Sequence, residues 1–184
     1  ENTLTSVIDR TVTSMGSRCL RRWLHSPLRS IDALQARQQC IAELLDSGYF
    51  VDLRQQLQGI GDVERIMSRV ALKSARPRDL ETLKLSIRAL PDIQQSLQQC
   101  NAPMLAALSA DIGEHPQVTQ LLDAAIRENP PVVLRDGGVI AEGYSAELDE
   151  LRSMGRNADD FLLQLEQRER EGRGIKTLKV SYNR

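Results

Sequence analysis

Apolar residues recur at helical spacing over the first two thirds of the chain. Leu20 and Leu24 lie four positions apart, and Pro27 then stops this first predicted helix. Ser30 can cap a second helix, which Gly48 follows as a typical C-terminal residue. One apolar stripe of the second helix comprises Ile31, Leu34, Ile41, Leu44 and Leu45.

Further helices are predicted up to about residue 128. One carries Val63, Ile66 and Val70 at helical spacing. Another begins at Pro77, a residue that fits the first position of a helix, and is expected to end before Pro91. Two shorter helices should open in the same way, at Pro103 and Pro116. Because alternation of period two is nearly absent, this part of the chain is predicted to be all-α with several helices.

Residues 129–143 interrupt the helical pattern. Pro130 and Pro131 cannot continue a helix, and residues 132–134 are typical of a short extended segment. The Asp-Gly-Gly sequence at 136–138 is a strong turn signal, after which residues 139–141 could return as a partner strand. We expect either a small hairpin or an ordered loop here.

One long helix is predicted from residue 145 to about residue 171. Its apolar positions alternate in steps of four and three, which is the 3.5-residue repeat of a coiled-coil seam. No later helix of the sequence can be the partner of this seam. We therefore expect that the helix either frays or pairs with the same seam of a second molecule, and we favour self-association. The seam comprises Tyr144, Leu148, Leu151, Gly155, Ala158, Leu162 and Leu165.

The last thirteen residues, 172–184, contain basic residues and no acid. Residues 178–182 alternate with period two, which predicts a short strand. A strand at the end of a chain has nothing to pair with, so we expect that the sequence is cut here. The basic side chains are candidates for contact with the DNA backbone, although exposed lysines are often only solubilising. These candidates are Arg173, Lys176, Lys179 and Arg184.

Composition narrows the functional class. The chain has 24 Lys+Arg and 25 Asp+Glu, a net charge of −1, so any nucleic-acid contact must be local. The three cysteines share no metal spacing, which favours a reducing compartment. No apolar run approaches the ~20 residues that span a bilayer, and no signal-peptide core is present at the N-terminus. We expect a cytoplasmic protein that does not associate with membranes.

The sequence shows no catalytic or metal-binding constellation. His25 and His115 are the only histidines, and no cluster of His, Cys and carboxylates has the spacing of a metal site. No phosphate-binding loop of the type GxxxxGK[ST] is present. Adjacent acids such as those at 149–150 point about 100° apart on a helix, so they share no substrate. We predict a chain with no enzymatic activity, no cofactor and no metal of its own.

A basic group lies in and after the first predicted helix. Two roles stay open for it: contact with DNA, and pairing with acids of a neighbour that is absent from this sequence. We favour the second role. The group comprises Arg18, Arg21, Arg22 and Arg29.

Five motifs, in order, resemble the core region of bacterial MutS-type DNA mismatch-repair proteins. Residues 11–28 resemble T-x-T-x-M-G-x-R-x-L-x-x-W-L-x-x-P-L, the opening of that region. The GDVER sequence from Gly61 and the RPRDL sequence from Arg76 follow. Residues 135–152 resemble the family's approach to its lever helix, and residues 177–183 resemble the first strand of its DNA clamp. The resemblance covers essentially the whole chain.

The resemblance implies a division of the chain and a function. It implies a helical core domain at 1–143, a long lever helix at 144–172 and the truncated start of the DNA clamp at 173–184. Proteins of the family are dimeric ATPases that encircle DNA, recognise mismatches and signal to MutL. Their mismatch-reading and ATPase motifs are missing here, so ATP and magnesium would belong only to the full-length protein.

The resemblance therefore predicts a fragment that couples the clamp to the ATPase. Its expected partners are double-stranded DNA, bound weakly and without sequence preference, and, in the full-length protein, MutL and a second MutS subunit. The alternative function is that of a helical protein-interaction scaffold. Two structural expectations complete the prediction: a salt bridge between two helices at Arg78 and Asp79, and close helix packing at Met15 and Gly16.

Overall fold

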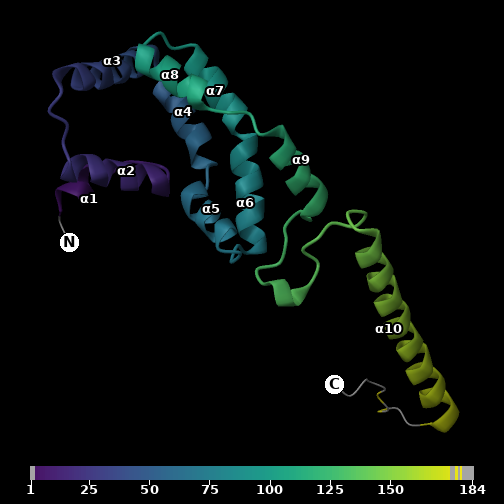
Figure 1. The fold of residues 1–184 in the computed structure, drawn as a ribbon. Coiled ribbons are helices and arrows are strands. Elements are labelled where there is room, and N and C mark those ends of the chain that lie inside the picture. Colours follow the sequence, from purple (N-terminus) through teal and green to yellow (C-terminus); the bar gives the residue numbers. More distant parts are fainter. Residues whose placement is uncertain (1–2, 175–176, 178, 180–184) are drawn as a thin grey trace. The chain divides into compact units, whose positions relative to one another are not determined.

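The computed structural model describes residues 3–174, 177 and 179, and the all-α prediction is confirmed (Figure 1). The chain divides into two compact units, Glu1–Ile140 and Ala141–Arg184. The helices of the first unit are α1 (Leu4–Ile8), α2 (Ser14–His25), α3 (Ile31–Ser47), α4 (Tyr49–Gln58), α5 (Val63–Ala71), α6 (Pro77–Arg88), α7 (Leu90–Gln98), α8 (Pro103–Asp111) and α9 (Pro116–Ala125).

Most of the predicted helix boundaries are confirmed. The Ser30 hydroxyl accepts a hydrogen bond from the N–H of Ala33 at 3.4 Å and so caps α3. Gly48 ends that helix in the left-handed conformation, with φ of +76°. Pro77, Pro103 and Pro116 each stand at the start of a helix, where the missing N–H costs no intrahelical hydrogen bond.

Three helices, α1, α4 and α7, were not expected from the sequence pattern. The helix predicted to begin at Pro77 and to end before Pro91 is α6, which stops at Arg88; Leu90, the last apolar position assigned to it, instead begins α7. Pro91 therefore lies in the first turn of α7 instead of terminating α6. A proline can follow the end of a helix, and it can also stand in the first turn of the next one, because the first N–H groups of a helix have no partner within it.

Two hydrophobic clusters hold the first unit together. The first joins α3, α4, α7 and α8, and the second joins α5, α6 and α9. The predicted stripe of α3 contributes little to either, because Ile31, Ile41 and Leu45 are exposed and Cys40 is the buried residue of that helix. The first cluster comprises Cys40, Leu53, Ile93, Leu97, Cys100, Ala102 and Leu105, and the second comprises Ile66, Leu83, Leu122, Ala125 and Ile126.

The segment after α9 forms an ordered loop and not a hairpin of its own two halves. Ile140 pairs with Ile126 in an isolated antiparallel bridge, and the N–H of Arg127 donates to the carbonyl of Val139 at 3.0 Å. The loop thus returns to the end of α9, and residues 134–136 form a short 3-10 turn. The N–H of Asn129 donates to Glu81 on α6 at 3.0 Å, which ties the loop to the helical core.

The second unit contains α10 (Ala146–Arg173), a continuous helix of 28 residues. The Ser145 hydroxyl caps its start by accepting from the N–H of Leu148, and Gly174 ends it in the left-handed conformation. The predicted strand at 178–182 lies outside the described residues except for Lys179. Within the described part of the chain, no helix is long and apolar enough to cross a membrane.

Candidate functional site

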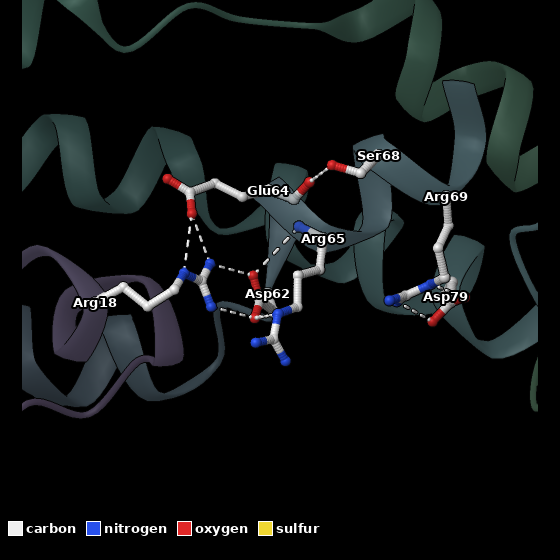
Figure 2. A network of polar contacts seen from close by, with 7 residues as sticks. All are labelled: Arg18, Asp62, Glu64, Arg65, Ser68, Arg69 and Asp79. Carbon is white, nitrogen blue, oxygen red and sulfur yellow. Dashed lines mark hydrogen bonds and ion pairs between the residues drawn. The ribbon is translucent and has the colours of Figure 1, made fainter. Parts of the chain in front are cut away.

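The most developed polar site of the first unit is an ion-pair network where α2 meets the start of α5 (Figure 2). Arg18 of α2 points its guanidinium at two acids of α5. Its Nη1 and Nη2 donate to the two oxygens of Asp62, both at 2.7 Å. Its Nη2 also donates to Glu64 at 2.6 Å, and its Nε to the same oxygen at 3.2 Å. This bidentate fork fixes α2 against α5 in one orientation.

Asp62 has two roles in this network. Its carboxylate holds Arg18, and it also accepts the N–H of Arg65 at 3.3 Å, which makes it the N-terminal cap of α5. The hydrogen bonds from Arg18 lower the pKa of Asp62 from 3.8 to about 2. Asp62 is therefore ionised at any physiological pH, so the fork is permanently charged.

Arg18 was predicted to contact DNA or the acids of an absent neighbour. The favoured alternative, pairing with an absent neighbour, is wrong for this residue, because its acids come from the same chain. Little in the sequence indicates this pairing. Asp62 and Glu64 are 44 and 46 positions away from Arg18, and acids at the start of a helix usually serve as caps.

A second ion pair joins α5 to α6. Arg69 donates to the two carboxylate oxygens of Asp79 at 2.8 and 2.7 Å (Figure 2). Asp79 also accepts the N–H of Arg76 at 2.9 Å, so it helps to cap α6. The Arg69 guanidinium lowers the pKa of Asp79 below its usual value. The expected salt bridge between two helices is thus confirmed for Asp79, whereas Arg78 is exposed and has no ion pair among the described residues.

Gly61, directly before Asp62 in the sequence, lies against α6. A Cβ at this position would stand 2.2 Å from Cγ2 of Thr82, closer than two carbon atoms can approach. The N–H of Gly61 donates to the hydroxyl of Ser86 at 2.9 Å, and Ser86 is only 1 % exposed. The absence of a side chain therefore allows the loop before α5 to rest directly on α6.

A third polar contact joins α6 to α9. Lys84 is buried, and its Nζ lies 3.8 Å from Asp123, which also accepts from Arg88 at 2.7 Å. Sequence reasoning missed these residues. Lys84 and Arg88 are one turn apart on α6, but nothing in the sequence indicates which acid faces them.

Glu43 of α3 caps a helix other than its own. Its carboxylate accepts the N–H of Asn101 and, at 2.6 Å, the N–H of Ala102, directly before α8. These backbone hydrogen bonds lower the pKa of Glu43 below its ordinary value. This contact also went unpredicted, because a cap from a distant helix leaves no local pattern.

Gly16 was expected to allow close packing between helices, and this expectation is wrong. A Cβ on Gly16 would stand 2.9 Å from the hydroxyl oxygen of Thr13 and 3.4 Å from Cβ of Thr11. The close approach is therefore to the turn that precedes α2. There the N–H of Gly16 donates to the Thr13 hydroxyl at 2.9 Å, the cap of the helix.

The four candidate DNA-backbone residues are not assembled into a site by the described structure. Arg173, in the last turn of α10, donates through Nε to Glu169 at 2.6 Å, so a neighbouring acid faces it. Lys179 is exposed. Lys176 and Arg184 lie outside the described residues.

The apolar seam of α10 is only partly covered. Leu148, Leu162 and Leu165 are half-buried, whereas Tyr144 and Leu151 are exposed; the side chain of Ala158 lies outside the description. Sequence reasoning missed two further apolar residues next to the seam, Met154 and Phe161, which are 54 % and 63 % exposed. Helical spacing places both beside the seam, so the apolar stripe of α10 is wider than the heptad pattern indicated.

The polar side chains described above contact one another and the backbone of neighbouring helices. No group of three or more metal-ligating side chains is close enough to hold an ion in the part of the chain that the structure describes. The charged groups of the network bind each other, and hydrogen bonds from Arg18 and Arg69 lower the pKa values of Asp62 and Asp79. The fold and the site define a helical domain. Buried apolar clusters and interhelical ion pairs fix the positions of its helices, and the second unit adds one long helix.

Comparison with known families agrees with this class. The family model of MutS domain III matches residues 1–178, which is nearly the whole chain. The chain belongs to the MutS domain III family. This membership gives it a role in DNA mismatch repair.

Proposed function

We propose that this chain is the helical core and lever of a mismatch-recognition ATPase, and that it transmits conformational changes between a DNA clamp and an ATPase. In this proposal residues 1–143 form the core, residues 144–172 the lever and residues 173–184 the start of the clamp. The chain itself performs no catalysis and holds no nucleotide. ATP and magnesium bind elsewhere in the longer protein.

The observation that carries the proposal is α10. Its 28 residues correspond to about 40 Å at 1.5 Å per residue, without a proline or a break. Pairs of opposite charge one turn apart, Glu166 with Arg170 and Glu169 with Arg173, brace its last turns at 2.6 Å each. A continuous helix of this length can carry a displacement from one end to the other.

The ion-pair network supports the same proposal for the core. A lever transmits force only if the body that anchors it does not deform. Arg18 and Arg69 each hold a carboxylate of another helix in a bidentate fork, which fixes helix orientation better than apolar contact alone. We infer that the core serves as a rigid support.

The proposed partners follow from the proposed role. Double-stranded DNA would be contacted weakly, through Arg173, Lys176, Lys179 and Arg184, and without preference for a mismatch. MutL and a second MutS subunit would be partners of the longer protein. The proposal places the protein in the cytoplasm, where DNA is repaired in bacteria.

A complementation experiment tests the proposal. A bacterial strain without its own mismatch-repair protein is supplied with the longer protein that carries this chain, either as the parent, as Met154→Pro or as Met154→Ala. Met154 is exposed and lies in the third turn of α10, inside the helix, so proline breaks the helix at a cost of about 3 kcal/mol and alanine keeps it.

We expect Met154→Ala to restore the low mutation rate and Met154→Pro to leave it high at the same protein level. If Met154→Pro restores the rate as well as the parent does, α10 does not act as a lever.

A further inference from the structure

Helix α2 carries an apolar surface that the first unit does not cover. No residue of α2 is buried, and Trp23 and Leu24 are 45 % and 39 % exposed. Helical spacing places Leu20, Trp23 and Leu24 on one side of α2 and Arg18 on the other. The ion pairs of Arg18 therefore fix α2 by its polar side and leave the apolar side available. Leu28, in the loop that follows, is 40 % exposed as well.

The same segment is strongly basic. Residues 18–37 contain five arginines and one acid, Asp32. Arg18 is neutralised by α5, but no carboxylate of the described residues lies within ion-pair distance of Arg22, Arg29 or Arg37. Elsewhere in the first unit, Arg69 and Arg88 each hold an acid of another helix. The segment that carries the uncovered side of α2 therefore has a local surplus of positive charge, to which Arg29 and Arg37 contribute.

One of these arginines is already held in place. The guanidinium of Arg37 on α3 lies over the ring of Trp23, 3.7 Å from its centre. A guanidinium stacked in this way keeps its N–H edges free for bidentate hydrogen bonds to a carboxylate. The stacking orders an apolar ring and a cation side by side before any partner arrives, which lowers the entropy cost of binding.

We propose that Leu20, Trp23, Leu24, Leu28, Arg29 and Arg37 form a docking surface for an acidic amphipathic helix of a protein partner. The apolar side chains would receive the apolar stripe of such a helix, and the arginines would pair with carboxylates along its edges. The inference uses no residue of α10, so it stands apart from the proposed lever function.

Charge and apolarity together favour a protein helix over other anionic partners. A DNA backbone would contact the arginines but leave Trp23 and the leucines exposed to solvent. A base could not stack on both faces of the Trp23 ring, because Arg37 already covers one of them. An anionic bilayer would need apolar side chains that protrude fully, whereas Leu20 is half-buried.

Trp23 is the only tryptophan of the chain and therefore reports on this surface directly. The full chain is titrated with a synthetic peptide that lacks tryptophan, is about 18 residues or five helical turns long, and carries leucines on one face and glutamates on the others. We expect saturable binding with a blue shift of the Trp23 emission. Arg29 lies in the loop between α2 and α3, so its replacement does not interrupt a helix. Arg29→Glu should weaken binding about tenfold or more.

Two further variants make the test specific. Leu24→Ser should weaken binding by a similar factor, because it removes part of the apolar surface. Arg78→Glu makes the same charge change at an exposed position of α6 and should leave the affinity unchanged. Circular dichroism verifies that each variant keeps its helices.

Four outcomes would overturn the proposal: no response to the acidic peptide, an equal response to a leucine–lysine peptide of the same pattern, a response only to duplex DNA, or a response only to vesicles that contain phosphatidylserine. Equal loss in Arg29→Glu and Arg78→Glu would also overturn it, because the effect would then be one of net charge.

Discussion

At the scale of single residues, Gly61 shows how closely two helices of the core are fitted. The loop before α5 rests on α6 at a position where one added carbon would collide with Thr82. Gly59, two positions earlier, offers a matched comparison, because its added carbon would meet only the carbonyl of Gln56 at an ordinary 3.5 Å.

Gly61→Ala should lower the free energy of unfolding by about 1–3 kcal/mol, the usual cost of overpacking. Gly59→Ala should change it by less than about 0.5 kcal/mol. Thr82→Ser removes the colliding methyl group and keeps a hydroxyl, so it should rescue Gly61→Ala in part. Urea denaturation of the two single variants and the double variant measures this. Equal stability of the Gly61→Ala and Gly59→Ala proteins would show that the loop can move away from α6.

Arg18 and Asp62 set a pH dependence with a defined sign. The pKa of Asp62 is about 2 in the folded chain against an ordinary 3.8, so the ionised form is favoured by folding. The stabilisation is therefore fully present above about pH 4 and is lost as the pH falls toward 2.

Arg18→Met should return the pKa of Asp62 toward 3.8 and remove this part of the acid sensitivity. An NMR titration of the Asp62 carboxyl carbon in the parent and in Arg18→Met measures both values. An unchanged midpoint would mean that another group, and not Arg18, holds the carboxylate ionised.

The residues also show what a sequence can predict at this scale. The Arg69–Asp79 pair was foreseeable because the two residues lie ten positions apart at the end of one helix and the start of the next. The partners of Arg18 and Lys84 were not, since tertiary packing brings them from distant helices. The requirement for glycine at position 61 could not be predicted from the sequence, because it arises only when the fold places Thr82 against this residue.

At the scale of elements, start signals were more reliable than interior periodicity. Ser30, Pro77, Pro103 and Pro116 marked helix starts correctly, because capping and the missing N–H of proline act locally. The helices α1, α4 and α7 escaped prediction because they are short or follow the preceding helix without a loop. The end of α10 was predicted near residue 171, and the helix runs to Arg173.

The stripe of α10 predicts self-association of the isolated chain. Leaving large apolar side chains in water forfeits on the order of 1.5–3 kcal/mol for each one that a partner could bury, and a two-fold contact buries both copies at once. Sedimentation should therefore show a mass that rises with concentration. Leu162→Glu combined with Leu165→Glu should abolish the rise.

Leu163→Glu is the matched control, because Leu163 is 65 % exposed and points well away from the seam. It should leave the association intact. A parent chain that stays monomeric at high concentration while residues 155–171 are protected from hydrogen exchange would show that α10 is ordered without a partner.

At the scale of the whole molecule, net charge and local charge have different consequences. The chain as a whole carries −1, so DNA binding can come only from local groups. Residues 172–184 contain basic residues and no acid, but Glu169, which precedes this segment on α10, pairs with Arg173. Family membership was predictable from motifs spread along the chain, whereas this pairing was visible only in the structure.

Binding to DNA should be weak, blind to mismatches and strongly dependent on salt. If Arg173, Lys176, Lys179 and Arg184 neutralise about four phosphates, log K should fall with a slope of about −3.6 against log salt concentration. Glu169→Gln frees Arg173 and should strengthen binding. Fluorescence anisotropy with matched and mismatched duplexes tests this. A tenfold preference for the mismatch, or no effect of Glu169→Gln, would contradict the assignment.

The central claim is that α10 couples a DNA clamp to an ATPase, and coupling between two sites is reciprocal. The most direct measurement is the affinity of the longer protein for mismatched DNA with and without a non-hydrolysable ATP analogue, in the parent, Met154→Ala and Met154→Pro. We predict that the analogue changes the DNA affinity by the same factor in the parent and in Met154→Ala. In Met154→Pro that factor should fall to about one while each ligand still binds by itself. If the factor is unchanged in Met154→Pro, the two sites communicate by another route and the account is wrong.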